Sequence, residues 1–245
     1  MRAAAIRIDG LRVAYDRGTV LDAIDGEFVA GSMTAVLGPN GAGKSSLLAA
    51  MAGMIRPVAG AIRILPPSRV AYLPQQSQID RGFPIRVVDV AALGLVPRIG
   101  AWRGLDAAQR HEADAALAAV GMADQGGRLI GELSTGQLQR VLFARLLLQD
   151  AAVVLLDEPF NAIDSGTTAD MLGLLHAWHR EGRTIVAALH DHDLVRRNFA
   201  DCVLLARRCI AWGATAEVLS PDHLERARRL AAAWEAPAPD VAGAR

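Results

Sequence analysis

A glycine-rich segment, GPNGAGKS at residues 38–45, constrains the possible folds of this chain more than any other feature of its sequence. An apolar run at residues 33–37 precedes it and predicts a buried strand, and the pattern of residues 45–54 predicts a helix after it. Glycines at this spacing let the backbone turn so that successive N–H groups point inward, next to the N-terminus of the helix. A strand, a glycine loop and a helix in this order predict an α/β fold that binds phosphate oxygens.

Two side chains of this segment have the chemistry of a nucleoside triphosphate site that also holds Mg²⁺. Lys44 is placed to reach the β- and γ-phosphates, and the Ser45 hydroxyl is placed to ligate Mg²⁺. Lys44 is also the single lysine among 26 basic residues, so a chain that uses arginine at every other basic position keeps lysine here. The alternative is a flexible glycine turn, which the complete pattern in its strand–loop–helix context disfavours.

The composition excludes several classes of protein. The 26 basic residues balance 26 acidic ones, so we expect neither a nucleic-acid partner nor a polybasic membrane anchor. Two cysteines, Cys202 and Cys209, are too few for a secreted disulfide framework. No run reaches the roughly 18 apolar residues of a membrane-spanning helix, and charges stand where a signal peptide would have its apolar core. We therefore expect a globular chain in a reducing compartment.

Periodicity divides the chain into a small antiparallel sheet, an α/β core and a helical insertion. The first 30 residues alternate polar and apolar positions between glycines, which predicts antiparallel strands. Later strands and helices alternate, which predicts a parallel sheet wrapped by helices. Strands are expected at residues 33–37, 61–65, 70–72, 152–156 and 184–189, with a hairpin at 203–205 and 210–212. Helices are expected at residues 87–95, 107–120, 134–148, 167–181 and 222–234.

These elements predict one domain over residues 5–235. Residues 85–122 contain no buried-strand run, so a helical subdomain is expected within it, at about residues 77–150. Residues 236–245 are expected to form a disordered tail.

A second motif, AVVLLDE at residues 152–158, carries the carboxylates. A buried apolar strand delivers them to its C-terminal edge, where ligands bind in open α/β sheets. Asp157 is placed to orient Mg²⁺ through its water shell, and Glu158 to polarise the water that attacks the γ-phosphate. A strand that ends in Asp-Glu often only caps the next helix, and the phosphate loop earlier in the chain is what favours the catalytic interpretation.

Between these two motifs, the segment LSTGQLQR at residues 133–140 resembles the signature sequence of ATP-binding-cassette (ABC) proteins, which is usually LSGGQ. Further positions match that family in the correct order: Tyr15, Gln75, the segment NAID at 161–164, and His190. The matches cover about residues 5–220. The chain is therefore similar to an ABC nucleotide-binding domain of the P-loop NTPase type, whose cofactors are ATP and Mg²⁺.

The resemblance implies a role for each matching residue. Tyr15 matches the aromatic that stacks on adenine, Gln75 the glutamine that contacts Mg²⁺ and senses the membrane partner, and His190 the switch histidine. The residues implied in catalysis are Glu158, His190 and Gln75, and those implied in Mg²⁺ binding are Ser45, Gln75 and Asp157. The residues implied in nucleotide binding are Tyr15, Gly38, Pro39, Asn40, Gly41, Ala42, Gly43, Lys44, Ser45, Ser46, Asp157, Ser134, Gly136, Gln137 and Asp164.

Some of these positions have simpler explanations. Tyr15 alone fits an aromatic on a sheet face, and Gln76 stands beside Gln75, which we prefer because it directly follows the strand and Pro74. The run HDHD at residues 190–193 resembles a metal cluster. Adjacent residues at a strand end cannot all point inward, however, and the two aspartates fit the start of the next helix.

One position departs from the family pattern. Thr135 stands where the signature usually has its first glycine. The Ser134 hydroxyl, the Gly136 N–H and the helix N-terminus are the groups expected to face a γ-phosphate. A threonine between them need not block that approach, so we expect activity to survive.

The resemblance also implies partners. In this family the signature of one subunit completes the phosphate site of another, so a second copy of this chain is expected in a head-to-tail dimer that sandwiches two ATP molecules. One cassette without a membrane span resembles the separate ATPase subunit of a bacterial transporter, peripheral to the cytoplasmic face of the cell membrane. It is expected to dock under permease subunits through the helical segment after Gln75. An extracytoplasmic metal-binding protein would act without touching it.

The transported substrate is predicted from softer similarities. Residues 79–90, 199–205, 210–213 and 217–219 resemble the same stretches of zinc and manganese importers, so we expect a divalent metal, with zinc first. Siderophore and haem importers are close relatives, and an exporter stays an alternative because ATPase motifs do not reveal direction. Three classes that do not transport are disfavoured. Translation-associated relatives carry two cassettes and DNA-repair relatives a long coiled coil, and this chain has neither feature. A non-catalytic sensor would have lost Glu158 or His190, and both are present.

Overall fold

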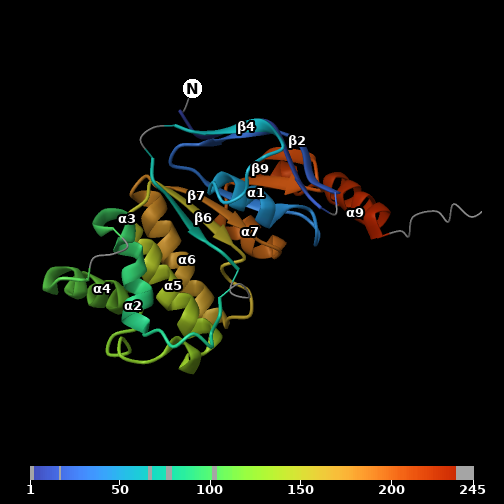
Figure 1. Cartoon of the computed structure of the whole chain (residues 1–245). Helices are drawn as coiled ribbons and strands as arrows, with labels where there is room; N and C mark the ends of the chain where they lie inside the picture. The colour runs from blue at the N-terminus through green and yellow to red at the C-terminus, as the bar shows by residue number, and fades with distance from the viewer. Residues whose placement is uncertain (1–2, 17, 66–67, 76–78, 101–103, 236–245) are drawn as a thin grey trace, which may run out of the picture.

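The computed structural model describes residues 3–16, 18–65, 68–75, 79–100 and 104–235. The chain folds into an antiparallel sheet of N-terminal strands, a larger mixed sheet, and helices around the latter (Figure 1). The helices α2, α3 and α4 gather at the end of the molecule away from the N-terminal sheet. The expected tail at residues 236–245 lies outside the described residues.

The N-terminal sheet has the strand order β2-β1-β4, and both of its strand pairs are antiparallel. Its strands are β1 (Ala4–Tyr15), β2 (Gly18–Val29) and β4 (Ala59–Ile64). Alternate side chains of β1, such as Ile6 and Ile8, are fully buried, while Arg7 between them is exposed. The antiparallel sheet predicted from the period of two is therefore confirmed, and the strand expected at 61–65 joins it.

The larger sheet has the strand order β5-β6-β7-β3-β8-β9, with β9 antiparallel to β8 and all other neighbours parallel. Its strands are β3 (Met33–Leu37), β5 (Val70–Leu73), β6 (Val153–Asp157), β7 (Thr184–Ala188), β8 (Asp201–Leu205) and β9 (Cys209–Ala214). Every residue of β3, β6 and β7 is buried, as near-continuous apolar runs require in a parallel sheet covered on both faces. The predicted parallel core is confirmed.

Two hydrophobic clusters lie on opposite faces of this sheet. In β3, Ala35 and Leu37 belong to one cluster and Val36 to the other, as the alternation of side chains requires. The first cluster includes Phe143 of α5 and Trp178 of α6, whose rings stack with centroids 6.0 Å apart. The second includes α1 and the buried side chains of β1 and β2. The sheet is thus covered by helices on one side and by α1 with the N-terminal sheet on the other.

The expected helices are present, with boundaries set by their caps, and two short helices at Val96–Ile99 and Thr215–Val218 were not expected. They are α1 (Lys44–Met51), α2 (Val87–Ala92), α3 (Val96–Ile99), α4 (Ala107–Ala119), α5 (Thr135–Gln149), α6 (Ser165–Arg180), α7 (His192–Asn198), α8 (Thr215–Val218) and α9 (Pro221–Glu235), with 3₁₀ turns at Leu93–Leu95 and Ile130–Glu132. The helix expected to reach residue 54 ends at Met51, because Gly53 takes a left-handed φ of 74°. Pro97 lies in the first turn of α3, where its missing N–H costs no hydrogen bond.

Gly94 tests the packing of the 3₁₀ turn Leu93–Leu95 against α5. A Cβ atom at this position would stand 2.2 Å from the carbonyl oxygen of Arg145. We expect Gly94→Ala to lower the free energy of unfolding by about 1–3 kcal/mol in urea denaturation, because the turn and α5 must move apart.

Gly173→Ala is the matched control. Gly173 is exposed in α6, and no atom of the described neighbours lies within 4 Å of an added Cβ. This change should raise the free energy of unfolding by about 0.5–1 kcal/mol, because alanine favours a helix. Equal stability of the two variants would show that the contact with α5 is not close.

Candidate nucleotide-binding and hydrolysis site

The segment at residues 38–45 forms the loop between β3 and α1, and its glycines are required by close approaches. A Cβ atom at Gly38 would lie 2.3 Å from the carbonyl oxygen of Leu205, and one at Gly43 would lie 2.4 Å from the side chain of Leu21. Both glycines have positive φ, 153° and 96°. The end of β8 and the strand β2 therefore hold this phosphate loop in place above the start of α1.

Lys44 folds back over the phosphate loop. The residue is 7% exposed, and its Nζ donates to the carbonyl oxygens of Gly38 at 2.9 Å and Pro39 at 3.2 Å. Burial lowers the pKa of Lys44, against the opposing effect of the negative charges on Glu158 and Asp157. A phosphate oxygen at this position would favour the charged ammonium, so the loop holds a cation suited to an anionic ligand.

Asp157 is buried at the end of β6 beside two hydroxyl groups. Ser45 Oγ donates to its Oδ1 at 3.0 Å, and the Tyr72 hydroxyl donates to its Oδ2 at 3.4 Å. Burial raises the pKa of Asp157, and the bond from Ser45 opposes this shift. Burial also raises the pKa of Tyr72. Carboxylate and hydroxyl oxygens are ligands that Mg²⁺ prefers, and a cation would relieve the buried charge, so these residues fit Mg²⁺.

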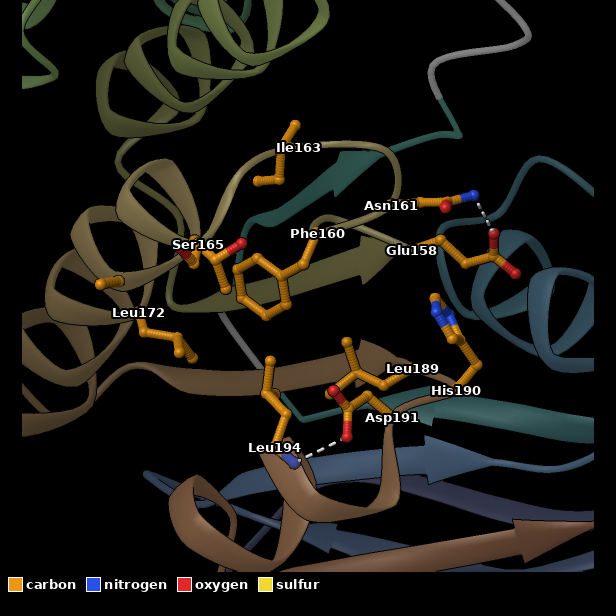
Figure 2. A pocket seen from close by; sticks show the side chains of 12 residues that line it. Glu158, Phe160, Asn161, Ile163, Ser165, Leu172, Leu189, His190, Asp191 and Leu194 are labelled. Carbon is orange, nitrogen blue, oxygen red and sulfur yellow. Dashed lines mark hydrogen bonds between the residues drawn. The ribbon is translucent and has the colours of Figure 1, made fainter.

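Glu158 and His190 line the same cavity, of about 410 Å³. Figure 2 shows their side chains near each other at one end of it. Asn161 Nδ2 donates to Glu158 Oε2 at 3.2 Å, the dashed line in Figure 2. Glu158 has a φ of 50°, and its N–H donates to the carbonyl of Ala188 on β7 at 3.1 Å. The neighbouring strand therefore holds the strained backbone that places this carboxylate.

The phosphate loop and Glu158 share a second cavity, of about 250 Å³, called here the phosphate cavity. Its lining residues are Val20, Asn40, Gly41, Ala42, Gly43, Lys44, Ser45, Ser46, Gln75 and Glu158. The structure thus brings Gln75, which follows β5, and Glu158, which follows β6, to the phosphate loop. Glu158 lines both cavities, so this residue borders the phosphate loop on one side and the cavity that contains His190 on the other.

Tyr15 lies beside the phosphate cavity, at the end of β1. Its side chain is exposed, and its hydroxyl is 3.2 Å from Ser46 Oγ of α1. It lines a third cavity, of about 490 Å³, called here the base-side cavity, whose other lining residues are Asp16, Gly18, Thr19, Val20 and Arg207. Val20 lines this cavity and the phosphate cavity, so the two adjoin. An exposed ring next to a phosphate site is suited to stacking on a base.

Ser134, Gln137 and Asp164 act as helix caps within the chain. Ser134 and Gln137 form a capping box at the start of α5, with bonds of 3.2 Å from the Gln137 N–H to Ser134 Oγ and 3.0 Å from the Ser134 N–H to Gln137 Oε1. Asp164 caps α6 by accepting from the N–H and the hydroxyl of Thr167, each at 2.8 Å, and these bonds lower its pKa. Among the described lining residues, neither these three nor Gly136 belongs to the phosphate cavity of the same chain.

The run at residues 190–193 begins α7, as its aspartates predicted. Asp191 Oδ1 accepts from the N–H groups of Asp193 and Leu194, each at 2.9 Å. Over the described ranges of the chain, no group of three His, Cys, Asp or Glu side chains is placed to hold a metal ion.

Cys202 is buried in β8, and burial raises the pKa of its thiol to about 12. Among the described helices, none combines the length and the apolar character of a bilayer-spanning segment.

Tyr72, Asn161 and Arg207 line the candidate site or contact its residues, and none of the three was assigned a role from the sequence. Tyr72 reaches Asp157 because β5 pairs in parallel with β6. Asn161 lies in the segment NAID that matched the family, and an amide three residues after the candidate catalytic carboxylate of Glu158 was an available signal. Arg207 had no such signal, because only the folded hairpin brings it to the base-side cavity.

A protein-family model described as ABC transporter matches residues 21–161. A probable metal transport system ATP-binding protein of Chlamydia pneumoniae is 40% identical over 89% of this chain and 86% of its own length. The manganese transport system ATP-binding protein MntB of Listeria monocytogenes is 36% identical over 90% of this chain and 94% of its own. The zinc transport system ATP-binding protein TroB of Treponema pallidum is 37% identical over 92% of this chain and 87% of its own.

A solved structure is also similar over most of the chain. It is an inward-facing ABC transporter described as of the metal-chelate type, and it matches with a TM-score of 0.83 and 26% sequence identity. The match covers 92% of this chain and 89% of that chain.

Asp157→Asn tests the electrostatic cost of the site. Because burial raises the native pKa of Asp157 above that of the unfolded chain, its charge costs stability at any pH above the native pKa, and the cost disappears as the pH falls through that value. We expect the variant to raise the Tm of the nucleotide-free chain at pH 7 by about 2–4 °C, with the difference shrinking in acid.

Asp114→Asn, at an exposed position in α4, is the matched control for the loss of one carboxylate. It should leave the Tm unchanged across the same pH range. A Tm of Asp157→Asn below that of the unchanged chain at pH 7 would mean that Asp157 stabilises the fold as an anion.

Proposed function

The chain belongs to the ABC transporter family, and we propose that, as the ATP-hydrolysing subunit, it drives the import of a divalent metal ion through a membrane permease. The observation that carries this proposal is the convergence of Lys44, Gln75 and Glu158 on the phosphate cavity. The phosphate cavity thus contains a cation that can bind phosphate, Lys44, and a carboxylate that can accept a proton from water, Glu158. The names of the relatives support zinc and manganese alike, and the similarities in the sequence favour zinc.

Different residues of the phosphate cavity have different roles in hydrolysis. The loop N–H groups and Lys44 hold the β- and γ-phosphates. Mg²⁺, when bound by Ser45 and Asp157, supplies Lewis-acid neutralisation of the phosphate oxygens. Glu158 accepts a proton from water as the water oxygen bonds to the γ-phosphorus and the bond to the β,γ-bridging oxygen breaks. Asn161 orients the Glu158 carboxylate through its 3.2 Å hydrogen bond.

The signature residues support a site completed by a second copy of the chain. Ser134, Gly136, Gln137 and Asp164 lie away from the phosphate cavity of their own chain, at the starts of α5 and α6. A helix N-terminus favours a nearby anion. We therefore assign these residues to the ATP held by the Lys44 of a second copy, in a head-to-tail dimer that ATP closes and hydrolysis opens.

We assign contact with the permease to the helical part of the chain, at about residues 77–150, which contains α2 to α5. Gln75 precedes this part and lines the phosphate cavity, so it is placed to link the permease to hydrolysis. The chain would then lie at the cytoplasmic face of the membrane, with a metal-binding protein on the opposite side that never touches it.

Glu158→Gln tests the catalytic assignment, because glutamine keeps the shape of the side chain but cannot accept the proton. We expect the ATPase rate to fall at least ~100-fold while ATP binding persists. Light scattering should then show a stable dimer in Mg-ATP. Lys44→Ala is the contrasting variant, which should lose ATP binding and stay monomeric. A Glu158→Gln chain that remains monomeric in Mg-ATP would rule out the shared site.

The transported metal is tested in cells that carry Glu158→Gln in place of the chromosomal copy, with the unchanged copy as control. Zinc, manganese and iron contents are measured under a chelator. We expect a selective fall in zinc, with growth restored by added zinc. A fall in manganese alone would identify manganese, not zinc, as the transported metal. A fall in iron alone would indicate a siderophore or haem importer. An unchanged metal profile would exclude metal import and favour an exporter.

A further inference from the structure

The turn between β8 and β9 carries Arg207 to the nucleotide site. The φ angle of Arg207 is 57°, in the left-handed region. Its N–H donates to the carbonyl of Ala42 in the phosphate loop at 3.0 Å, and its carbonyl accepts from the N–H of Asp22 on β2 at 2.8 Å. A non-glycine residue keeps this conformation only where its surroundings hold it. Hydrogen bonds to the phosphate loop and to β2 therefore hold the turn on both sides. They fix the backbone position from which the Arg207 side chain extends.

The guanidinium group of Arg207 contacts the C-terminal helix α9, which packs against β8 and β9 (Figure 1). Its Cζ atom lies 4.5 Å from the centroid of the Trp234 ring, the geometry of a cation–π contact. Its Nε is buried and has no hydrogen-bond partner among the described residues. The next residue, Arg208, instead pairs with Asp22. A buried, unpaired donor is costly, which points to an acceptor that the described residues do not supply.

The place of Arg207 identifies the part of the ligand that it meets. It lines the base-side cavity with Tyr15, and it is not among the lining residues of the phosphate cavity, where Lys44 lies. An adenine ring offers an aromatic face and acceptor nitrogens on its edges. The Tyr15 ring therefore matches the aromatic face of adenine, and the Arg207 guanidinium group matches its acceptor nitrogens.

We propose that Arg207 is a nucleotide-binding residue that donates a hydrogen bond to the adenosine part of ATP, and that Trp234 is its positioning residue. This inference rests on the ATP site of the proposed function. It extends that site to the C-terminal helix, because α9 carries the ring that holds the guanidinium group.

The test compares ADP with inorganic pyrophosphate, which lacks the adenosine group, by calorimetry on the full chain. We expect Arg207→Ala to weaken ADP binding by about tenfold, the contribution of one hydrogen bond from a charged donor, and to leave pyrophosphate binding unchanged. Trp234→Leu keeps an apolar side chain without the aromatic face and should weaken ADP binding by about threefold. Trp234→Phe should restore most of that loss.

Arg229→Ala is the matched control, because Arg229 is an arginine of α9 that pairs with Glu225 at the surface. It should bind ADP as the unchanged chain does. Arg207→Lys keeps the charge without the planar guanidinium group and should show an intermediate loss, and it takes the place of Arg207→Ala if that variant does not fold.

Unchanged ADP binding in the Arg207 variants would overturn the proposal. Equal weakening of ADP and pyrophosphate would also overturn it, because the turn would then act through the phosphate loop and not through the base. If the unchanged chain failed to bind ADP at all, the proposed ATP function would fall, and this inference with it.

Discussion

A hydrogen bond of 3.0 Å from Ser45 to Asp157 joins segments that are 112 residues apart in the sequence, and the candidate site depends on it. Asp157 is 1% exposed and Lys44 is 7% exposed, so both charged groups have lost most of their hydration. Their pKa values move in opposite directions for one reason, burial: that of Asp157 rises and that of Lys44 falls. A phosphate and a cation bound together would relieve both shifts. Nucleotide and Mg²⁺ are therefore expected to bind as a unit at this edge of the sheet.

The parts of the site that are close together in the chain could be predicted from the sequence. The loop at residues 38–45 and the strand that ends at Asp157 each follow from a local pattern, an apolar run and the motif directly after it. Tyr72 and Arg207 could not be predicted, because each reaches the site through tertiary structure. Tyr72 depends on the parallel pairing of β5 with β6, and Arg207 on a turn that folds back onto the phosphate loop. Helix boundaries shifted where a cap decided them, as at α6, which is capped by Asp164 and begins at Ser165, two residues before the expected residue 167.

The helix caps suggest why closure on a second copy would be reversible. Ser134 and Gln137 satisfy each other at the start of α5, and Asp164 is satisfied by Thr167 at the start of α6. A single copy therefore leaves these groups paired and stable without nucleotide. Contact with a γ-phosphate would exchange existing hydrogen bonds for new ones, so its net gain is modest and loss of the phosphate is enough to reverse it.

A crystal structure of the Glu158→Gln chain with Mg-ATP would test the shared ATP site. Two copies are predicted to lie head to tail around two ATP molecules. Each γ-phosphate should lie within hydrogen-bonding distance of Lys44 from one copy and of Ser134 and Gly136 from the other, with the metal between the phosphates and Asp157. ATP bound to the phosphate loop of a single copy, or a dimer in which Ser134 faces away from the nucleotide, would contradict the shared site.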